Sequence, residues 1–108
     1  EYLESDSDSQ YTEAEFSGGE KAFAKFISLN TIYPKESIIK NEQGTCYLTF
    51  IVEPDGNITH VKIFKGVSDD IDMEGKRLIR STPKWIPGTV DNKPARTRCR
   101  VPINFTLT

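Results

Sequence analysis

The stretch Thr45–Gly66, TCYLTFIVEPDGNITHVKIFKG, decides the fold of this chain. Its first half alternates apolar and polar side chains, which is the period of a strand with one buried face. Residues 54–57 then form a turn, because Pro54 presets its own backbone angle and Gly56 accepts a positive one. The second half returns as another strand that ends at Gly66. The stretch therefore predicts an antiparallel hairpin, with its apolar face made by Cys46, Leu48, Phe50, Val52, Val61 and Ile63.

A helix and a third strand follow the hairpin. Residues 68–82 carry a capping Ser68 or Asp69, acids in the first turn, basic residues toward the end, and Pro83 as a stop. Residues 96–107 alternate again, which predicts the third strand. The helix runs back along the sheet, so the third strand is parallel to the second and antiparallel to the first. In a wholly antiparallel sheet it must pair with the first strand, which gives the order 2-1-3. Pro102 supports that order, because proline in a ladder is tolerated at an edge.

The residues before the hairpin add two helices. One is predicted over 19–29, and a second, shorter one begins near Pro34 and ends before Gly44. Residues 1–15 are acidic and rich in serine, so we expect a disordered linker or tail there and one folded domain over 16–108. The predicted fold class is α+β. It has a small antiparallel three-stranded sheet, helices on one face, and the element order α-α-β-β-α-β.

Composition excludes several classes of protein. The net charge is −2, and no run approaches the ~18 apolar residues of a membrane span. The chain lacks an initiator methionine and a signal-peptide pattern, so we expect it to be a piece of a longer protein. Its excess of basic residues outside the acidic start is too weak to predict nucleic-acid binding.

Candidate catalytic and metal-binding residues are few. His60 has no nucleophile or acid placed beside it, so we interpret it as a solvent-facing strand residue. The acids at 69–74 match the start of a helix better than a calcium loop. Cys46 and Cys99 have neither zinc-site nor redox spacing, and the predicted pairing sets them several steps apart. We therefore expect two reduced, buried thiols, no metal, no cofactor and no enzymatic activity.

Three arginines on one face of the last strand leave two interpretations open. Arg96, Arg98 and Arg100 recur at period two, which can attract an anionic partner. The same charges can protect an edge strand from unwanted pairing. An RNA-binding sheet would need exposed aromatic residues beside them, and only Tyr47 on the neighbouring strand is available.

Several short motifs, taken together in order and spacing, resemble a known family. They are Tyr33-Pro34, Gly44, the pattern F-V-PDG-I--V-I--G over 50–66, PKW-PG at 83–88 and VPINF at 101–105. This set resembles the C-terminal domain of TonB-family energy transducers, and residues 15–34 resemble a form with a Phe-Gly-Gly lead-in. The resemblance covers about residues 15–108.

The resemblance implies a periplasmic, non-catalytic domain tethered to the inner membrane by a helix and a linker outside this chain. That anchor would engage a proton-driven motor of the ExbB/ExbD type. The domain would grip the TonB box, a short peptide of outer-membrane TonB-dependent transporters, by adding it as a strand to the edge of the last strand. It would then transmit energy for nutrient uptake.

Site residues follow from the same resemblance. The edge it assigns to the peptide runs from Thr97 to Phe105 and includes Arg98, Cys99, Arg100, Val101 and Ile103. It adds Asn30 and Thr31 before the Tyr-Pro pair, and the arginine stripe adds Arg96. The residues it assigns to the framework are Tyr33, Pro34, Gly56, Trp85, Pro87 and Gly88. Trp85 is expected to pin the crossover between the third helix and the last strand by packing.

The sequence also departs from the family. Gly75 and Thr82 replace larger apolar residues, which predicts loose packing of the third helix. Residues 90–93, VDNK, replace the more usual turn of this region. TonB-like domains are also attached to other membrane proteins, including sensor-peptidase-like ones. The alternative function is therefore an interaction or sensory module of such a parent, or self-association into a homodimer through the same edge.

Overall fold

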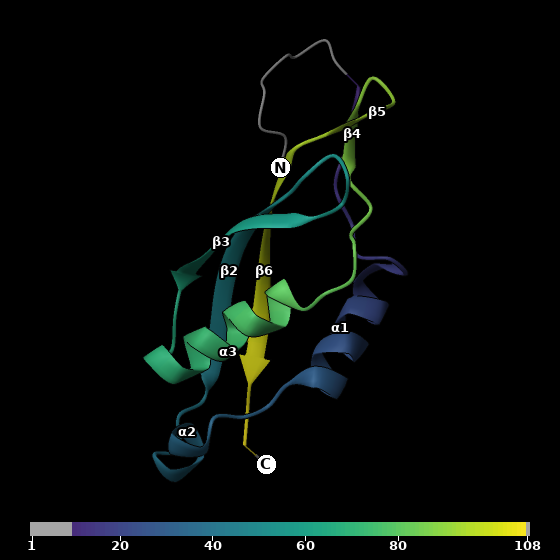
Figure 1. Cartoon of the computed structure of the whole chain (residues 1–108). Helices are drawn as coiled ribbons and strands as arrows, with labels where there is room; N and C mark the ends of the chain where they lie inside the picture. Colours follow the sequence, from purple (N-terminus) through teal and green to yellow (C-terminus); the bar gives the residue numbers. More distant parts are fainter. Residues whose placement is uncertain (1–9, 108) are drawn as a thin grey trace.

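The computed structural model describes residues 10–107 of the chain (Figure 1). Its helices are α1 (Gly19–Asn30), α2 (Lys35–Ile39) and α3 (Asp69–Arg80). Its strands are β1 (Tyr11–Thr12), β2 (Gly44–Val52), β3 (Ile58–Lys65), β4 (Gly88–Val90), β5 (Lys93–Ala95) and β6 (Thr97–Phe105). The predicted α+β class and the three predicted helices are confirmed.

The main sheet has β2 at its centre, in the order β3-β2-β6. β3 pairs with β2 through the predicted hairpin, with two register shifts. β6 pairs with β2 in one unbroken antiparallel register that runs from Gly44 opposite Phe105 to Val52 opposite Thr97. The predicted order 2-1-3 is confirmed, with β2, β3 and β6 as its first, second and third strands.

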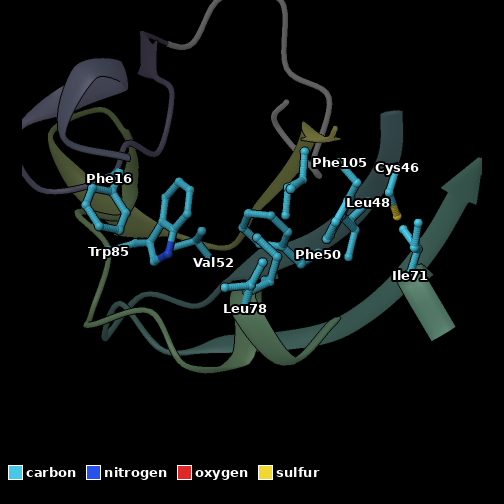
Figure 2. Packing of buried hydrophobic residues seen from close by; sticks show 11 residues of the cluster. Phe16, Cys46, Leu48, Phe50, Val52, Ile71, Leu78, Trp85 and Phe105 are labelled. Carbon is cyan, nitrogen blue, oxygen red and sulfur yellow. The ribbon is translucent and has the colours of Figure 1, made fainter. Parts of the chain in front are cut away.

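The core lies between this sheet and α3 (Figure 2). The inward side chains of β2 and the inward face of α3 are at most 1% exposed, because strand and helix bury their apolar residues against each other. Ser68 caps α3 as predicted, since its hydroxyl accepts from the amide of Ile71. The fully buried side chains at this contact are Cys46, Leu48, Phe50, Val52, Ile71, Leu78 and Ile79.

The expectation that α3 packs loosely is wrong. A Cβ atom at Gly75 would lie 3.3 Å from the sulfur of Cys46 and 3.5 Å from a methyl carbon of Leu48. The glycine therefore marks the closest approach of helix to strand rather than a gap. Thr82 is also engaged, because its hydroxyl donates to the carbonyl of Ile79 and accepts from the indole of Trp85.

A second sheet, of order β1-β4-β5, was not predicted from the sequence. β1 pairs with β4, with Tyr11 opposite Val90 and Thr12 opposite Thr89. Glu15 forms a further bridge to Ile86. This pairing corrects the expected boundary at residue 15, because residues 10–15 are tied to a segment far along the chain and local composition gives no sign of it. Residues 1–9 of the expected tail lie outside the described residues.

The turn that joins β4 and β5 explains the VDNK sequence. Asp91 and Asn92 have φ angles of 50° and 67°. Two consecutive positive φ angles are typical of the tight hairpin turn whose twist matches the flanking strands, and Asp and Asn tolerate them. The turn expected at residues 90–93 is confirmed.

Trp85 packs as predicted, at the crossover from α3 to the second sheet. Its ring lies 5.1 Å from that of Phe50 and 5.5 Å from that of Phe16, measured between centroids (Figure 2). Its backbone amide donates to the carbonyl of Gly56 in the β2–β3 turn. The crossover, the hairpin turn and the start of the domain therefore meet at one aromatic residue.

The two cysteines are free, as expected, but they differ in burial. Cys46 is fully buried, whereas Cys99 is half-buried, so the expectation of two buried thiols holds only for Cys46. The register sets them apart, because Cys46 lies opposite Ile103 and Cys99 opposite Phe50. Burial raises the pKa of Cys46 to about 12 and that of Cys99 to about 11.

The contact between Gly56 and Trp85 gives a stability prediction with a matched control. Gly56 (φ 87°) and Gly19 (φ 83°) share a left-handed backbone, but a Cβ at Gly56 would meet the carbonyl oxygen of Trp85 at 2.4 Å, whereas one at Gly19 meets nothing within 4 Å. We expect Gly19→Ala to lower the free energy of unfolding by about 1–2 kcal/mol. Gly56→Ala should lower it by a further ~1–3 kcal/mol through overpacking. Urea unfolding of both variants measures the difference, and equal losses would contradict the close approach.

Candidate peptide-binding edge

β6 is an edge strand, because it pairs with β2 on one side and with no other strand among residues 10–107. In an antiparallel strand, successive residues turn their N–H and C=O groups to opposite sides. Which residues of β6 face the open side therefore decides what main-chain groups a partner can reach.

Two observations give the same answer. Glu53 directs its backbone toward β3, since its N–H donates to Asn57 and its carbonyl accepts from Gly56. Backbone direction alternates along β2, so its even-numbered residues, from Val52 back to Gly44, direct their N–H and C=O groups toward β6. These residues lie opposite the odd-numbered residues of β6. Pro102 agrees, because it has no N–H to give to β2. The even-numbered residues that face the open side are Arg98, Arg100, Pro102 and Asn104.

A cavity of about 450 Å³ runs beside the second half of β6. Its far wall is the inward face of α1 and the two residues Thr31 and Tyr33 that follow the helix. No side chain of α1 is fully buried, although Phe23, Phe26 and Ile27 pack against the edge of the core. We call this the α1 cavity; it is lined by Phe23, Ala24, Ile27, Ser28, Thr31, Tyr33 and residues 102–106.

A second cavity, of about 360 Å³, continues along the first half of β6. Here the far wall is the segment before α1, with Glu13 and Ala14, and Trp85 closes the cavity on the crossover side. We call this the lead-in cavity; it reaches β6 at residues 98–101. Together the two cavities accompany the open edge along its length.

The structure brings together most of the residues that the sequence predicted for the site, but in different roles. Cys99, Val101, Ile103 and Phe105 turn their side chains to the core face and line the two cavities. Thr97 is 3% exposed and donates to the carbonyl of Ala95, so it belongs to the framework.

The two predicted residues before Tyr33 also separate. Thr31 lines the α1 cavity, whereas the side chain of Asn30 turns back and donates to the carbonyl of Phe26. The sequence did not predict the outward-facing backbone of Pro102 and Asn104 or the cavity-lining positions of Phe23, Ala24 and Ile27. The apolar spacing of α1 was a signal for these helix residues, but it could not show that they border the last strand.

The arginines lie on the outer face of the sheet, away from α3. Arg96 forms an ion pair with Glu53, with 2.8 Å between Nε and Oε1. The guanidinium carbon of Arg100 lies 4.1 Å from the ring centroid of Phe64, which is 57% exposed. Arg96 and Arg100 therefore have partners within the domain, which fits a role in protecting the edge. Their charges also border the open edge, which fits attraction of an anionic partner.

Other predicted candidates lie away from this edge. His60 is exposed, as expected, with a φ of 54° at a register shift of β3. It borders a separate cavity of about 550 Å³ together with Arg80 and Lys84. Within residues 10–107, no group of three His, Cys, Asp or Glu side chains is placed to hold a metal ion, and no helix is long and apolar enough to cross a membrane.

The Glu53–Arg96 pair gives a pH prediction. Hydrogen bonds from Arg96 and then Thr59 lower the pKa of Glu53. A carboxyl group whose pKa is lowered by folding stabilises the fold above its unfolded pKa of ~4.3, and this contribution is lost as the pH falls through the folded pKa. We expect Glu53→Gln to destabilise the domain at pH 7 and the difference from wild type to shrink below pH 4. Thermal unfolding from pH 3 to 7 measures it, with the exposed Glu20→Gln as control; a pH-independent difference would contradict the ionic origin.

Comparison with known proteins identifies the family and the fold. The family described as "Gram-negative bacterial TonB protein C-terminal" matches residues 30–107. Two solution structures of the Helicobacter pylori TonB C-terminal domain, a longer and a shorter form, match the fold with TM-scores of 0.62 and 0.60. They are 22% and 23% identical, each match covers 80% of this chain, and the matches cover 78% and 90% of the two domains. No curated protein matches the chain.

The family match rests on the residue pattern, and the structural matches rest on the fold. The family match spans every element from the end of α1 to β6, and the structural matches extend over most of the described residues. TonB C-terminal domains are typically periplasmic and interact with TonB-dependent receptors. The chain belongs to the TonB C-terminal domain family, whose non-enzymatic domains transduce energy to outer-membrane receptors.

Proposed function

We propose that the open edge of β6 binds the TonB-box peptide of an outer-membrane transporter as an added strand. The observation that carries this proposal is an edge strand with outward main-chain groups and a cavity on its inner side along both halves. An added strand gains affinity from main-chain hydrogen bonds and specificity from alternate side chains. The edge of β6 offers both.

The geometry favours a particular pattern in the peptide. Side chains of an added strand alternate between the two faces of the sheet. Those on the inner face would enter the α1 cavity and the lead-in cavity, whose walls include Phe23, Ile27 and Trp85, so apolar side chains fit there. Those on the outer face would lie beside Arg98 and Arg100, where acidic side chains are favoured.

Energy transfer in this proposal follows the strands. A peptide paired with β6 would be held by several main-chain bonds at once, and β6 is itself paired with β2 along its whole length. A pull along the strands would then load many bonds together instead of one at a time. The remaining parts of the proposed pathway are a periplasmic location, an inner-membrane anchor outside this chain, and a motor of the ExbB/ExbD type.

The main-chain part of the proposal is testable at one residue. Asn104→Pro removes an outward N–H but no backbone hydrogen bond between β2 and β6, whereas Asn104→Ala keeps the N–H. Both variants lose the bond from the Thr45 hydroxyl to Asn104 Oδ1, so that loss cancels in the comparison. We expect Asn104→Pro to weaken peptide binding about five- to tenfold relative to Asn104→Ala, the value of about one hydrogen bond of ~1 kcal/mol. Titration of the ¹⁵N-labelled chain with TonB-box peptides from transporters of the same genome measures both.

Two results would count against edge binding. One is equal affinity of the Pro and Ala variants, which would show that the outward N–H is not used. The other is a set of peptide-induced shifts confined to residues away from 97–105. Pairing of two chains through this edge, the alternative use, would appear as a concentration-dependent size in the absence of peptide, which sedimentation measures.

The arginine face gives an electrostatic prediction. Replacing Arg98 and Arg100 by Gln should weaken the binding of an acidic peptide at low salt and change it little at high salt, because exposed charges are screened. Arg80→Gln is the matched control, since Arg80 carries the same charge on α3, away from the open edge. Isothermal titration at two salt concentrations checks this. A loss that is the same at both would indicate direct hydrogen bonding by the guanidinium groups instead.

A further inference from the structure

The α1 cavity has one wall without regular secondary structure. Residues 30–33, which we call the strap, begin at the last residue of α1 and continue toward α2 without regular secondary structure from Thr31 on. Thr31 and Tyr33 of the strap face the α1 cavity, and the ring of Tyr33 lies 5.8 Å from that of Phe105, between centroids. The position of the strap therefore sets the width of the cavity beside β6.

The strap is held from the opposite side by two residues of α3. The amide of Ile32 donates to Oε2 of Glu74 at 2.7 Å. The guanidinium of Arg77 donates to the carbonyl of Asn30 at 2.9 Å. The two side chains also hold each other, with 2.6 Å between Arg77 Nε and Glu74 Oε1 and 2.7 Å between Arg77 Nη2 and Glu74 Oε2.

This arrangement is more specific than a surface ion pair. Glu74 is 8% exposed although it carries a carboxylate, and its oxygens are satisfied by Arg77 and by the strap. A buried carboxylate is costly unless it is paired and hydrogen-bonded, whereas an exposed pair three residues apart on a helix adds little. The pair is placed to reach another segment, since both members contact main-chain atoms of the strap.

We infer that Glu74 and Arg77 form a latch, a pair of positioning residues that hold the strap so that the α1 cavity is open beside β6 before any peptide arrives. The consequence for binding rests on the proposed function. With the strap fixed, a peptide does not have to order it, and a binding site that is ordered in advance binds more tightly. The latch thus links α3, on one side of the strap, to the α1 cavity and β6 on the other side.

The test replaces the latch without leaving a buried charge. Glu74→Met/Arg77→Met keeps an unbranched side chain and a high helix propensity at both positions. It removes the buried Glu74 carboxylate together with its half-exposed partner, so that no buried charge is left unpaired. Arg80→Met is the matched control, because Arg80 has the same charge on the same helix and is exposed. Arg77→Lys retains the charge but not the two-pronged geometry.

Three readouts separate positioning from stability: the melting temperature, hydrogen exchange of the Ile32 amide, and affinity for the tightest TonB-box peptide. In the double variant we expect Ile32 to exchange at least tenfold faster and peptide binding to weaken roughly tenfold, from the cost of ordering the freed strap, with the fold retained. Arg80→Met should change neither, and Arg77→Lys should lie between the two. If the double variant does not fold, Arg77→Lys alone carries the test.

Each other result overturns a defined part of this inference. Unchanged exchange at Ile32 in the folded variants would show that no latch exists. Faster exchange with unchanged peptide affinity would show that the strap does not position the site. If wild type binds no peptide, the proposed function fails, and the latch then stands or falls on the exchange of Ile32 and the Tyr33–Phe105 contact alone.

Discussion

The structure depends on the hydrogen-bond ladder between β2 and β6. β2 is the only strand of the main sheet, within the described residues, with partners on both sides, so its backbone groups are satisfied within the fold. Among residues 10–107, β6 has a partner strand on one side only. The odd-numbered residues of β6 direct their N–H and C=O groups to β2, and the even-numbered residues direct theirs outward. The proposed activity uses these outward groups.

An open edge that is available to a peptide is also available to unwanted partners. β6 carries features that limit this without closing the edge. Pro102 removes one outward donor, Arg98 and Arg100 place charge beside the edge, and α1 and the lead-in segment flank it with cavities instead of a flat surface. Charge protection and attraction of an acidic peptide are therefore two consequences of one arrangement, and the structure does not require a choice between them.

The surroundings of the edge are assembled from distant parts of the chain. The Gly56–Trp85 contact joins the β2–β3 turn to the crossover, and Phe16 packs on the same indole from the lead-in segment. The second sheet fixes residues 10–15 beside the start of β6, while Glu74 and Arg77 hold the strap beside its end. Each wall of the site is thus tied to the core by a contact that lies outside the site.

The main sheet and the three helices could be predicted from the sequence, because their signals are local. Alternation in β2 and β6, the PDG turn and the cap at Ser68 each act within a few residues, and Pro102 added the strand order. The family resemblance also came from spacing along the chain. Features that depend on distant contacts were not predictable in this way. β1, β4 and β5 are too short to show a period, and Glu74 was interpreted only as one of the acids at the start of its helix.

The rest of the site became visible only in the folded chain. The folded chain sets the close approach of α3 to β2 at Gly75. It also divides β6 into residues whose backbone is bonded to β2 and residues whose backbone faces the open side. It also placed α1 beside the strand with space between them. The physical reason is that a pattern of side chains reports which face is buried, whereas the position of a neighbouring element is set by contacts between residues far apart in the sequence.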